Sequence, residues 1–454
     1  MRVLISAADG SALGRIWYRV VRGASRDHAL ALTDQAIVSG TSLLTTLLIA
    51  RWSNPAQLGV YTVGTTLLLS IVGFQESLIL EPYLIQRYYG NTTAAERAGA
   101  ALMLSFGFSA LSTLICAVAA FGFLELSDSR EMILTTAAIA VIAPFALTRN
   151  FARRLLFARL EFRDALVIDV AVAVVQLSTL VWLGWKGQMS ALSAWVAFGA
   201  ANAFTAIGWL YHARADFIVR MRHVSTVLKQ SWPLGKWLLV GQITALVQGN
   251  ITYWLSISVA GAAVTGLFAA CMSIVGLANP MLLGLGNSIM PRSVIAWNNG
   301  GGRQLFHEAL RNTVLVAILM VGFTLAIVFA GEKVMTLLFH GAEYQGYRHV
   351  LIVLALSILA GALGSPAQFA LAAMERARLI VASATIGSVA TVILVWVLMT
   401  QWGLLGAAYG LLGGGAIGSV GRWIAFLRVA HRTAPVSDNG MPGRPRSATS
   451  DRAL

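Results

Sequence analysis

Twelve long apolar stretches follow one another along the chain and leave no interval for a water-soluble domain. They lie near residues 30–50, 57–80, 98–123, 131–150, 166–185, 190–211, 236–259, 262–288, 312–331, 349–373, 379–400 and 403–427. Each stretch is close to the ~20 residues that a helix needs to cross a bilayer. Only 11% of the 454 residues are charged, whereas a soluble domain carries roughly 25%. We therefore predict an all-α, polytopic membrane protein and exclude a soluble enzyme.

The basic residues indicate how these twelve spans are oriented. Twelve spans place both termini on one side of the membrane, and that side holds 28 of the 33 Lys and Arg residues. The positive-inside rule assigns it to the cytoplasm. The same rule explains the net charge of +14, so no nucleic-acid partner is expected.

An internal repeat divides the spans into two halves. Gln35 precedes Gly59 by 24 residues, and Gln242 precedes Gly266 by the same interval. Because each half has six spans, the copies run in parallel, and transporters of this design hold their substrate between the halves. Chance similarity between apolar helices is the alternative. The predicted organisation is a basic amphipathic cytoplasmic N-terminus (1–29), an N-lobe (30–211), a linker (212–235), a C-lobe (236–427) and a disordered cytoplasmic tail (428–454).

Polar side chains gather in the first two spans of each half. Polar residues inside a membrane are costly and mark functional sites, so we predict a substrate cavity here. Its predicted residues are Gln35, Ser39, Ser42, Gln75, Glu76, Gln242, Gln248, Asn250 and Asn279. The alternative is that Ser and Thr bond their own backbone or join helices, and that Glu76 belongs to a buried structural pair. Asp34, Glu81, Asp169 and Lys236 lie near span ends, where solvation at the interface is the expected reason for their charge.

Signals for catalysis or cofactor binding are weak. The two cysteines, Cys116 and Cys271, suit neither a disulfide framework nor a metal site. The seven His residues form no metal-ligand pair, and no P-loop is present. The GxGxxG pattern at 413–418 lies inside an apolar span, so it indicates helix packing rather than dinucleotide binding. We expect no enzyme activity, no metal and no cofactor beyond a coupling ion.

Four segments resemble a known family of transporters. They are DQAIVSGTSLLTTLLIARWSNPAQLGVYTVGTTLLL (34–69), RRLLFARLEFRDALV (153–167), LLFHGAEYQGY (337–347) and WGLLGAAYGLL (402–412). In combination they resemble bacterial polysaccharide flippases of the multidrug/oligosaccharidyl-lipid/polysaccharide (MOP) exporter superfamily. The resemblance implies two six-helix lobes in the bacterial inner membrane. It also implies a lipid-linked oligosaccharide as substrate, with membrane lipids, a polysaccharide polymerase and export machinery as partners.

The resemblance further implies cations that meet the pyrophosphate of the lipid carrier. The nearest candidates at the cytoplasmic mouth are Arg87, Arg149, Lys236 and Arg292. The leading hypothesis is export of undecaprenyl-pyrophosphate-linked repeat units, with Glu76 binding a coupling H⁺ or Na⁺. The alternatives are a drug or organic-cation antiporter of the same superfamily, and a membrane-embedded glycan polymerase or ligase.

Overall fold

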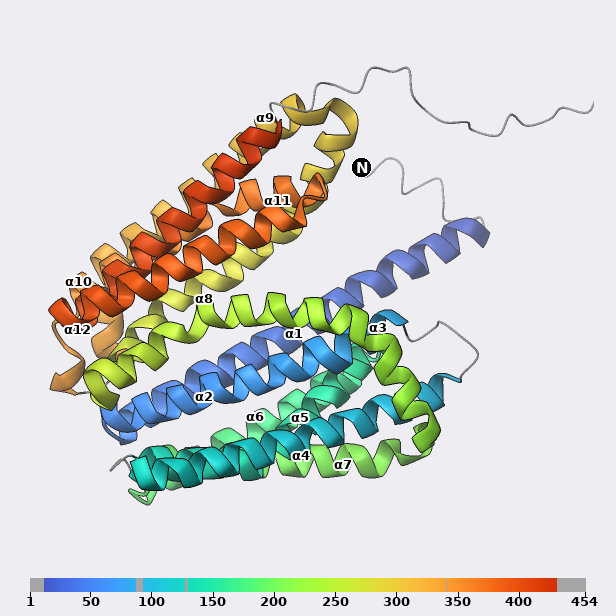
Figure 1. Cartoon of the computed structure of the whole chain (residues 1–454), viewed down its shortest axis with the longest axis horizontal. Helices are drawn as coiled ribbons and strands as arrows, with labels where there is room; N and C mark the ends of the chain where they lie inside the picture. Colours follow the sequence, from blue (N-terminus) through green and yellow to red (C-terminus); the bar gives the residue numbers. More distant parts are fainter. Residues whose placement is uncertain (1–11, 87–92, 127–129, 340, 431–454) are drawn as a thin grey trace, which may run out of the picture. The chain divides into compact units, whose positions relative to one another are not determined.

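The computed structural model describes residues 12–86, 93–126, 130–339 and 341–430, and these residues form helices and short connections without a β-strand. The helices are α1 (Ala12–Trp52), α2 (Pro55–Gln75), a π-helical segment (Glu76–Leu80), α3 (Glu81–Gln86), α4 (Ala94–Leu126), α5 (Arg130–Arg159), α6 (Phe162–Trp185), α7 (Ala191–Ala213), α8 (Met221–Val275), α9 (Asn279–Leu338), α10 (Arg348–Ala362), α11 (Ser365–Ala373) and α12 (Ala377–Ala430). Figure 1 shows them along the chain. The predicted tail beyond residue 430 and the first eleven residues lie outside the described part.

Three of these helices are interrupted by sharp turns, and the 3-10 segment Gly276–Ala278 connects the second part of α8 to the first part of α9. The described residues therefore contain twelve long helical segments. The turns lie at Gly261 in α8, at 300–301 in α9 and at 402–403 in α12. Gly261, Gly301 and Gly403 each have a positive φ, a conformation that side chains with a Cβ resist. The π-helical segment joins α2 to α3, and a short turn joins α10 to α11. The prediction of about twelve spans is confirmed for the described part of the chain.

The chain forms two compact units. Unit 1 comprises Met1–Ile274 with Lys333–Tyr347, and unit 2 comprises Val275–Glu332 with Arg348–Leu454. In unit 1, α5 packs against α2, α4 and α7, while α6 packs against α1 and α7. In unit 2, α10 and α11 pack against α12. The lobe boundaries expected from the sequence stay a prediction.

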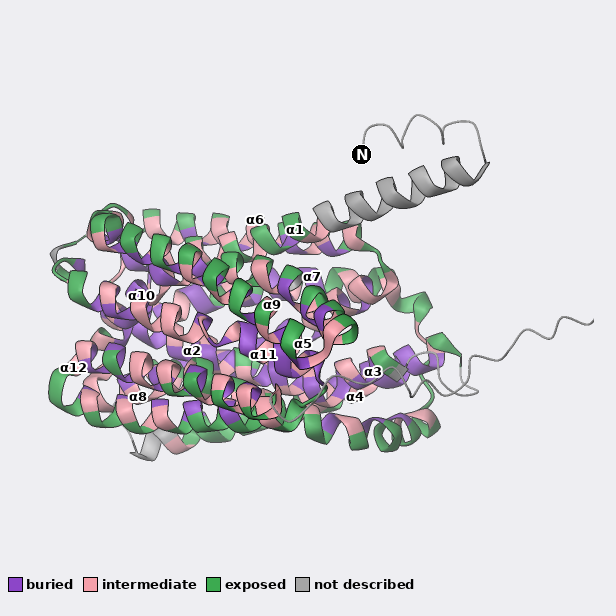
Figure 2. Ribbon diagram, turned by 90° about the horizontal axis from the view of Figure 1, so that it is seen from above, coloured by how far each residue is buried: buried purple, intermediate pink, exposed green. Residues whose placement is uncertain are grey.

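The interiors of both units are filled by apolar side chains. Phe151, Leu155 and Leu80 belong to one buried cluster of unit 1. Phe426 and Leu371 belong to a buried cluster of unit 2. Figure 2 shows buried residues on the inner faces of helices and exposed ones on the outer faces. Each helix therefore contributes one packed face.

Two glycines that the internal repeat makes equivalent lie against each other in unit 1. A Cβ on Gly59 would lie 2.9 Å from the backbone nitrogen of Gly266, and a Cβ on Gly266 would lie 2.9 Å from that of Gly59. The absence of side chains lets the backbones of α2 and of the segment after Gly261 touch, as small residues do between membrane helices. Residues on a two-fold axis contact their own equivalents, so this reciprocal contact supports the repeat proposed from the sequence.

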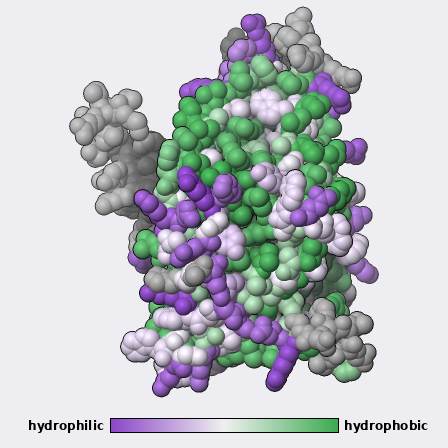
Figure 3. Space-filling model, turned by 90° about the vertical axis from the view of Figure 1, so that its left-hand side faces the viewer, coloured by the Kyte–Doolittle hydropathy of each residue, from purple (hydrophilic) through white to green (hydrophobic). Residues whose placement is uncertain are grey.

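Large hydrophobic side chains cover the outer faces of the helices. Phe121, Val141 and Phe329 are among them, at 64%, 68% and 76% exposed. Figure 3 shows hydrophobic side chains over much of the visible surface. An exposed apolar area of this extent must be shielded from water, as the lipid of a membrane would do. Nine described helical stretches are long and apolar enough to cross a bilayer. The chain is a multi-pass membrane protein.

Candidate functional site

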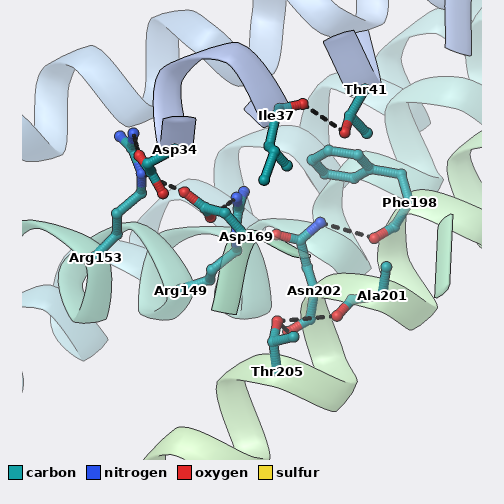
Figure 4. Close-up of polar contacts among 10 residues, drawn as sticks. All are labelled: Asp34, Ile37, Thr41, Arg149, Arg153, Asp169, Phe198, Ala201, Asn202 and Thr205. Atoms are coloured by element: carbon teal, nitrogen blue, oxygen red, sulfur yellow. Dashed lines mark hydrogen bonds and ion pairs between the residues drawn. The ribbon is translucent and has the colours of Figure 1, made fainter. Parts of the chain in front are cut away.

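Two arginines on one face of α5 hold two buried carboxylates in unit 1. Arg149 and Arg153 are four residues apart, a spacing that places both on the same side of a helix. Arg153 donates from Nη2 to Asp34 of α1 and from Nε to Asp169 of α6, each over 2.6 Å. Arg149 also pairs with Asp169. Figure 4 shows these four side chains meeting between the three helices.

Burial makes this cluster strongly interdependent. Asp34 is 1% exposed and Asp169 is 2% exposed. Removing one partner of a buried ion pair leaves an uncompensated charge and costs roughly 3–5 kcal/mol. The prediction that Asp34 and Asp169 are solvated at span ends is therefore wrong. Their position along the spans suggested exposure, but the facing helix supplies guanidinium groups that replace water.

Glu76 lies at the start of the π-helical segment and binds the next arginine of α5. Its Oε1 accepts from Arg154 Nε over 2.8 Å, and its Oε2 lies 2.7 Å from Arg154 Nη2. Asn150 Nδ2 adds a 3.2 Å hydrogen bond to Oε1. π-Helical turns occur often at functional sites. Of the two interpretations that the sequence left open for Glu76, the structure shows the ion pair.

Gln75, the residue before it, is fully buried and bonds within unit 1. Its Nε2 donates to the Leu147 carbonyl over 3.2 Å, and its Oε1 accepts from Asn150 over 3.3 Å. Asn150 thus joins the neighbouring side chains of Gln75 and Glu76. The amide of Gln75 fastens the end of α2 to α5.

A cavity of about 330 Å³ opens beside the arginine cluster. Helices α1, α2, α5, α6 and α7 form its wall, and Arg149, Arg153 and Asp169 line it. Its other polar or aromatic lining residues are Thr41, Ser42, Tyr61, Thr65, Asn150, Gln176, Trp195, Phe198 and Asn202. The volume is at the lower end of the ~300–1,000 Å³ range of ligand pockets.

Hydrogen bonds and ring contacts order the wall of this cavity. Gln176 donates to Thr45 over 2.8 Å, and Asn202 donates to the Phe198 carbonyl over 2.8 Å. The rings of Tyr61 and Trp195 are 5.2 Å apart. The cavity thus combines aromatic surface, amide groups and guanidinium groups, which together suit a polar organic ligand with an anionic group.

The structure separates the other predicted cavity residues into several environments. Gln35 is exposed and donates to Ser39 over 3.3 Å. The Gln242 side chain occupies the space beside Gly73, where a Cβ would collide with it. Gln248 is exposed, and Asn250 is half-buried. Of the predicted residues, Ser42 and Arg149 line the cavity described above.

The remaining predicted residues lie elsewhere. Lys236 is exposed on α8, with its Nζ 6.0 Å from the Trp237 ring. Asn279 and Arg292 are exposed residues of unit 2. Arg87 is outside the described residues. Within the described ranges, no group of three His, Cys, Asp or Glu residues could hold a metal ion.

Sequence reasoning missed the part played by Arg153, Asn150, Gln176 and Asn202. A signal was present, because Arg149 and Arg153 share a helix face and acidic residues stand inside spans 1 and 5. Pairing these groups requires knowing which helices are neighbours. That information is not contained in the spacing along one helix.

Comparison with known proteins identifies structures that share this fold. No family model matches the chain, and no curated protein matches its sequence. Among solved structures, an inward-facing multidrug resistance MATE family transporter of the MOP superfamily matches with a TM-score of 0.69 and 14% identity, over 88% of this chain and 96% of that one. The lipid II flippase MurJ, in an inward closed conformation, matches at 0.66 and 15%, over 89% and 90%.

A third solved structure is a MOP superfamily transporter from Pyrococcus furiosus, whose binding pocket is described as reversed in polarity. It matches with a TM-score of 0.59 and 14% identity, over 89% of this chain and 95% of that one. These likenesses extend over most of every chain compared. The protein therefore has the fold of the MOP superfamily transporters.

Proposed function

We propose that the chain is a flippase that moves undecaprenyl-pyrophosphate-linked oligosaccharide across the bacterial inner membrane by alternating access. Such units serve the biosynthesis of exopolysaccharide, capsule or O-antigen. The observation that carries the proposal is the position of Arg149 in the wall of the cavity. A guanidinium has five N–H donors, and the described contacts of Arg149 use one Nη for Asp169 and leave Nε without a partner.

Pyrophosphate suits these arginines because guanidinium groups bind phosphate oxygens with two parallel hydrogen bonds. Asp169 holds Arg149 from one side, so the guanidinium is positioned before the substrate arrives. Arg153 is oriented in the same way by its two carboxylate partners. The substrate anion therefore meets a prearranged pair of cations, which reduces the ordering cost of binding.

The rest of the cavity suits a sugar. Tyr61 and Trp195 supply aromatic faces, while Asn202 and Gln176 supply amides that can bond hydroxyl groups. With about 330 Å³, the cavity accommodates the pyrophosphate end of the substrate and the adjoining sugar rather than a whole repeat unit. The polyprenyl tail stays in the lipid. Contacts with more distant sugars remain predictions for the other polar residues named from the sequence, which are Gln35, Gln242, Gln248, Asn250 and Asn279.

The paired state of the carboxylates argues against the organic-cation alternative. An organic cation in this cavity would need a carboxylate free to bind it, whereas Asp34 and Asp169 both have guanidinium partners. A cation entering the cavity would find Asp169, the carboxylate in its wall, already bound by both Arg149 and Arg153. The solved structures with this fold include both a multidrug transporter and the lipid II flippase, so the choice of substrate rests on the cavity itself.

A flipping assay with purified protein tests this proposal. Proteoliposomes would carry a fluorescent lipid-pyrophosphate oligosaccharide, and lectin access would report its arrival in the far leaflet. Arg149→Gln should lower the initial rate about ten- to hundredfold, because a hydrogen bond to a charged group contributes roughly 1.5–3 kcal/mol. Arg149→Lys should retain an intermediate rate, since it keeps the charge and loses the two-pronged geometry.

The matched control is Arg163→Gln, which removes an exposed arginine outside the cavity. Its rate should stay close to that of the unmodified protein, because this side chain is exposed and does not line the cavity. An Arg149→Gln rate equal to that of the control would refute the role of this cavity. Absence of flipping across several glycans, with transport of organic cations instead, would favour the antiporter. Lengthening of the glycan would indicate the polymerase.

A further inference from the structure

A groove between α6 and α7 of unit 1 has a polar end and an apolar end. Its polar hollow has a volume of about 640 Å³ and its apolar hollow about 460 Å³. The two hollows share Val167, Ala171 and Phe204 in their walls, so one runs into the other. This groove is separate from the arginine-lined cavity, since no residue lines both.

The apolar hollow lies on an exposed apolar surface of α6 and α7. Val167, Val174 and Phe204 are 66%, 62% and 65% exposed. The hollow extends along α6 from Leu166 to Val175, which is about 14 Å at 1.5 Å per residue. That length is close to half of the ~30 Å hydrocarbon core. The hollow therefore has the depth of one leaflet.

The polar hollow lies at the end of the groove that the distribution of basic residues assigns to the cytoplasm. Arg159 and His212 line it together with three carboxylates, those of Glu161, Asp164 and Asp216. Arg159 Nη1 binds Asp216 Oδ2 over 2.6 Å. Glu161 and Asp164 are exposed and form no ion pair within the described ranges. The hollow is thus locally acidic on an otherwise basic side of the protein.

We propose that this groove binds one phospholipid with an ethanolamine head group from the cytoplasmic leaflet. Glu161 and Asp164 receive the ammonium group, and Arg159 with His212 contacts the phosphate. One acyl chain lies in the apolar hollow beside Val167 and Phe204. The charge pattern selects this lipid, because an anionic head group would meet two unpaired carboxylates whereas a zwitterionic one is matched at both of its charges.

Native mass spectrometry of the detergent-solubilised full chain tests the proposal. The protein would be titrated with phosphatidylethanolamine and, separately, with phosphatidylglycerol of the same acyl chains. We expect tighter binding of phosphatidylethanolamine. The double variant Glu161→Gln/Asp164→Asn should weaken that preference about fivefold, as expected for losing two exposed ion contacts. Both positions are exposed, so this variant should fold normally.

Two further comparisons locate the binding to the groove. Ala171→Phe places a ring where the two hollows join and should reduce binding of phosphatidylethanolamine, whereas Val181→Phe, at an exposed α6 position outside the groove, should not. Glu375→Gln removes an exposed carboxylate of unit 2 and should leave the preference unchanged. Equal binding of the two lipids, or an unchanged preference in the carboxylate double variant, would overturn the proposal. Displacement of phosphatidylethanolamine by polyprenyl pyrophosphate would assign the groove to the carrier lipid instead.

Discussion

The contact of Arg153 with two buried carboxylates predicts a large and specific loss of stability when it is removed. In Arg153→Leu, Asp169 keeps Arg149, but Asp34 loses its only ion-pair partner within the described ranges. Asp34 is 1% exposed, so its carboxylate remains buried without compensation. We expect the free energy of unfolding to fall by roughly 3–5 kcal/mol. Denaturant unfolding in lipid–detergent bicelles would measure this change.

A double-mutant cycle separates the charge from the shape of the side chain. Asp34→Asn removes the stranded charge, so adding it to Arg153→Leu should recover most of the loss. The expected coupling energy is about 2–3 kcal/mol, the upper part of the range for residues in one network. Arg163→Leu, at an exposed site, should change stability by less than about 0.5 kcal/mol. A loss below ~1 kcal/mol in Arg153→Leu, or purely additive effects in the double variant, would refute this account of the cluster.

Two other substitutions test the remaining features. Gly59→Ala should destabilise unit 1 by roughly 1–3 kcal/mol, because its Cβ would meet the backbone of the segment after Gly261. The control Gly40→Ala has open space around it and should be neutral or stabilising by up to ~1 kcal/mol. Equal unfolding midpoints for the two variants would contradict the close contact. Glu76→Gln should abolish the dependence of flipping on an ion gradient if Glu76 binds the coupling H⁺ or Na⁺. The flipping rate of Glu76→Gln would be measured with and without the ion gradient, and Glu375→Gln would serve as the control. Full gradient-dependent flipping in Glu76→Gln would show that Glu76 does not bind the coupling ion.

The positions of the helices could be predicted because the information is local. Each span is an apolar stretch of its own, and each of the twelve predicted stretches overlaps one helical segment of the described chain. Some helices extend beyond the predicted bounds, as α1 does by beginning at Ala12 and α8 by beginning at Met221. The repeat was also visible, since Gly59 and Gly266 stand at equal distances from Gln35 and Gln242. That these two glycines touch could not be read from their spacing.

The candidate site was only partly predictable. Arg149 and Ser42 were named from the sequence and line the cavity. Gln75 was named as a cavity residue, yet its amide forms hydrogen bonds that join α2 to α5. A polar residue in a span must satisfy its hydrogen bonds somewhere, but the sequence does not say whether a ligand or a neighbouring helix does so.

Hydropathy and charge along the chain therefore determined the number of spans, their approximate positions and the expected side of the basic loops. These follow from the cost of placing each segment in lipid or water, which depends on that segment alone. Only the tertiary structure decided which charges meet. Asp34 and Arg153 are 119 residues apart in the chain, and their contact depends on how α1 and α5 are rotated about their own axes. That rotation is set by the packing of all the helices in the unit, so this buried ion pair can form only when the whole unit is folded.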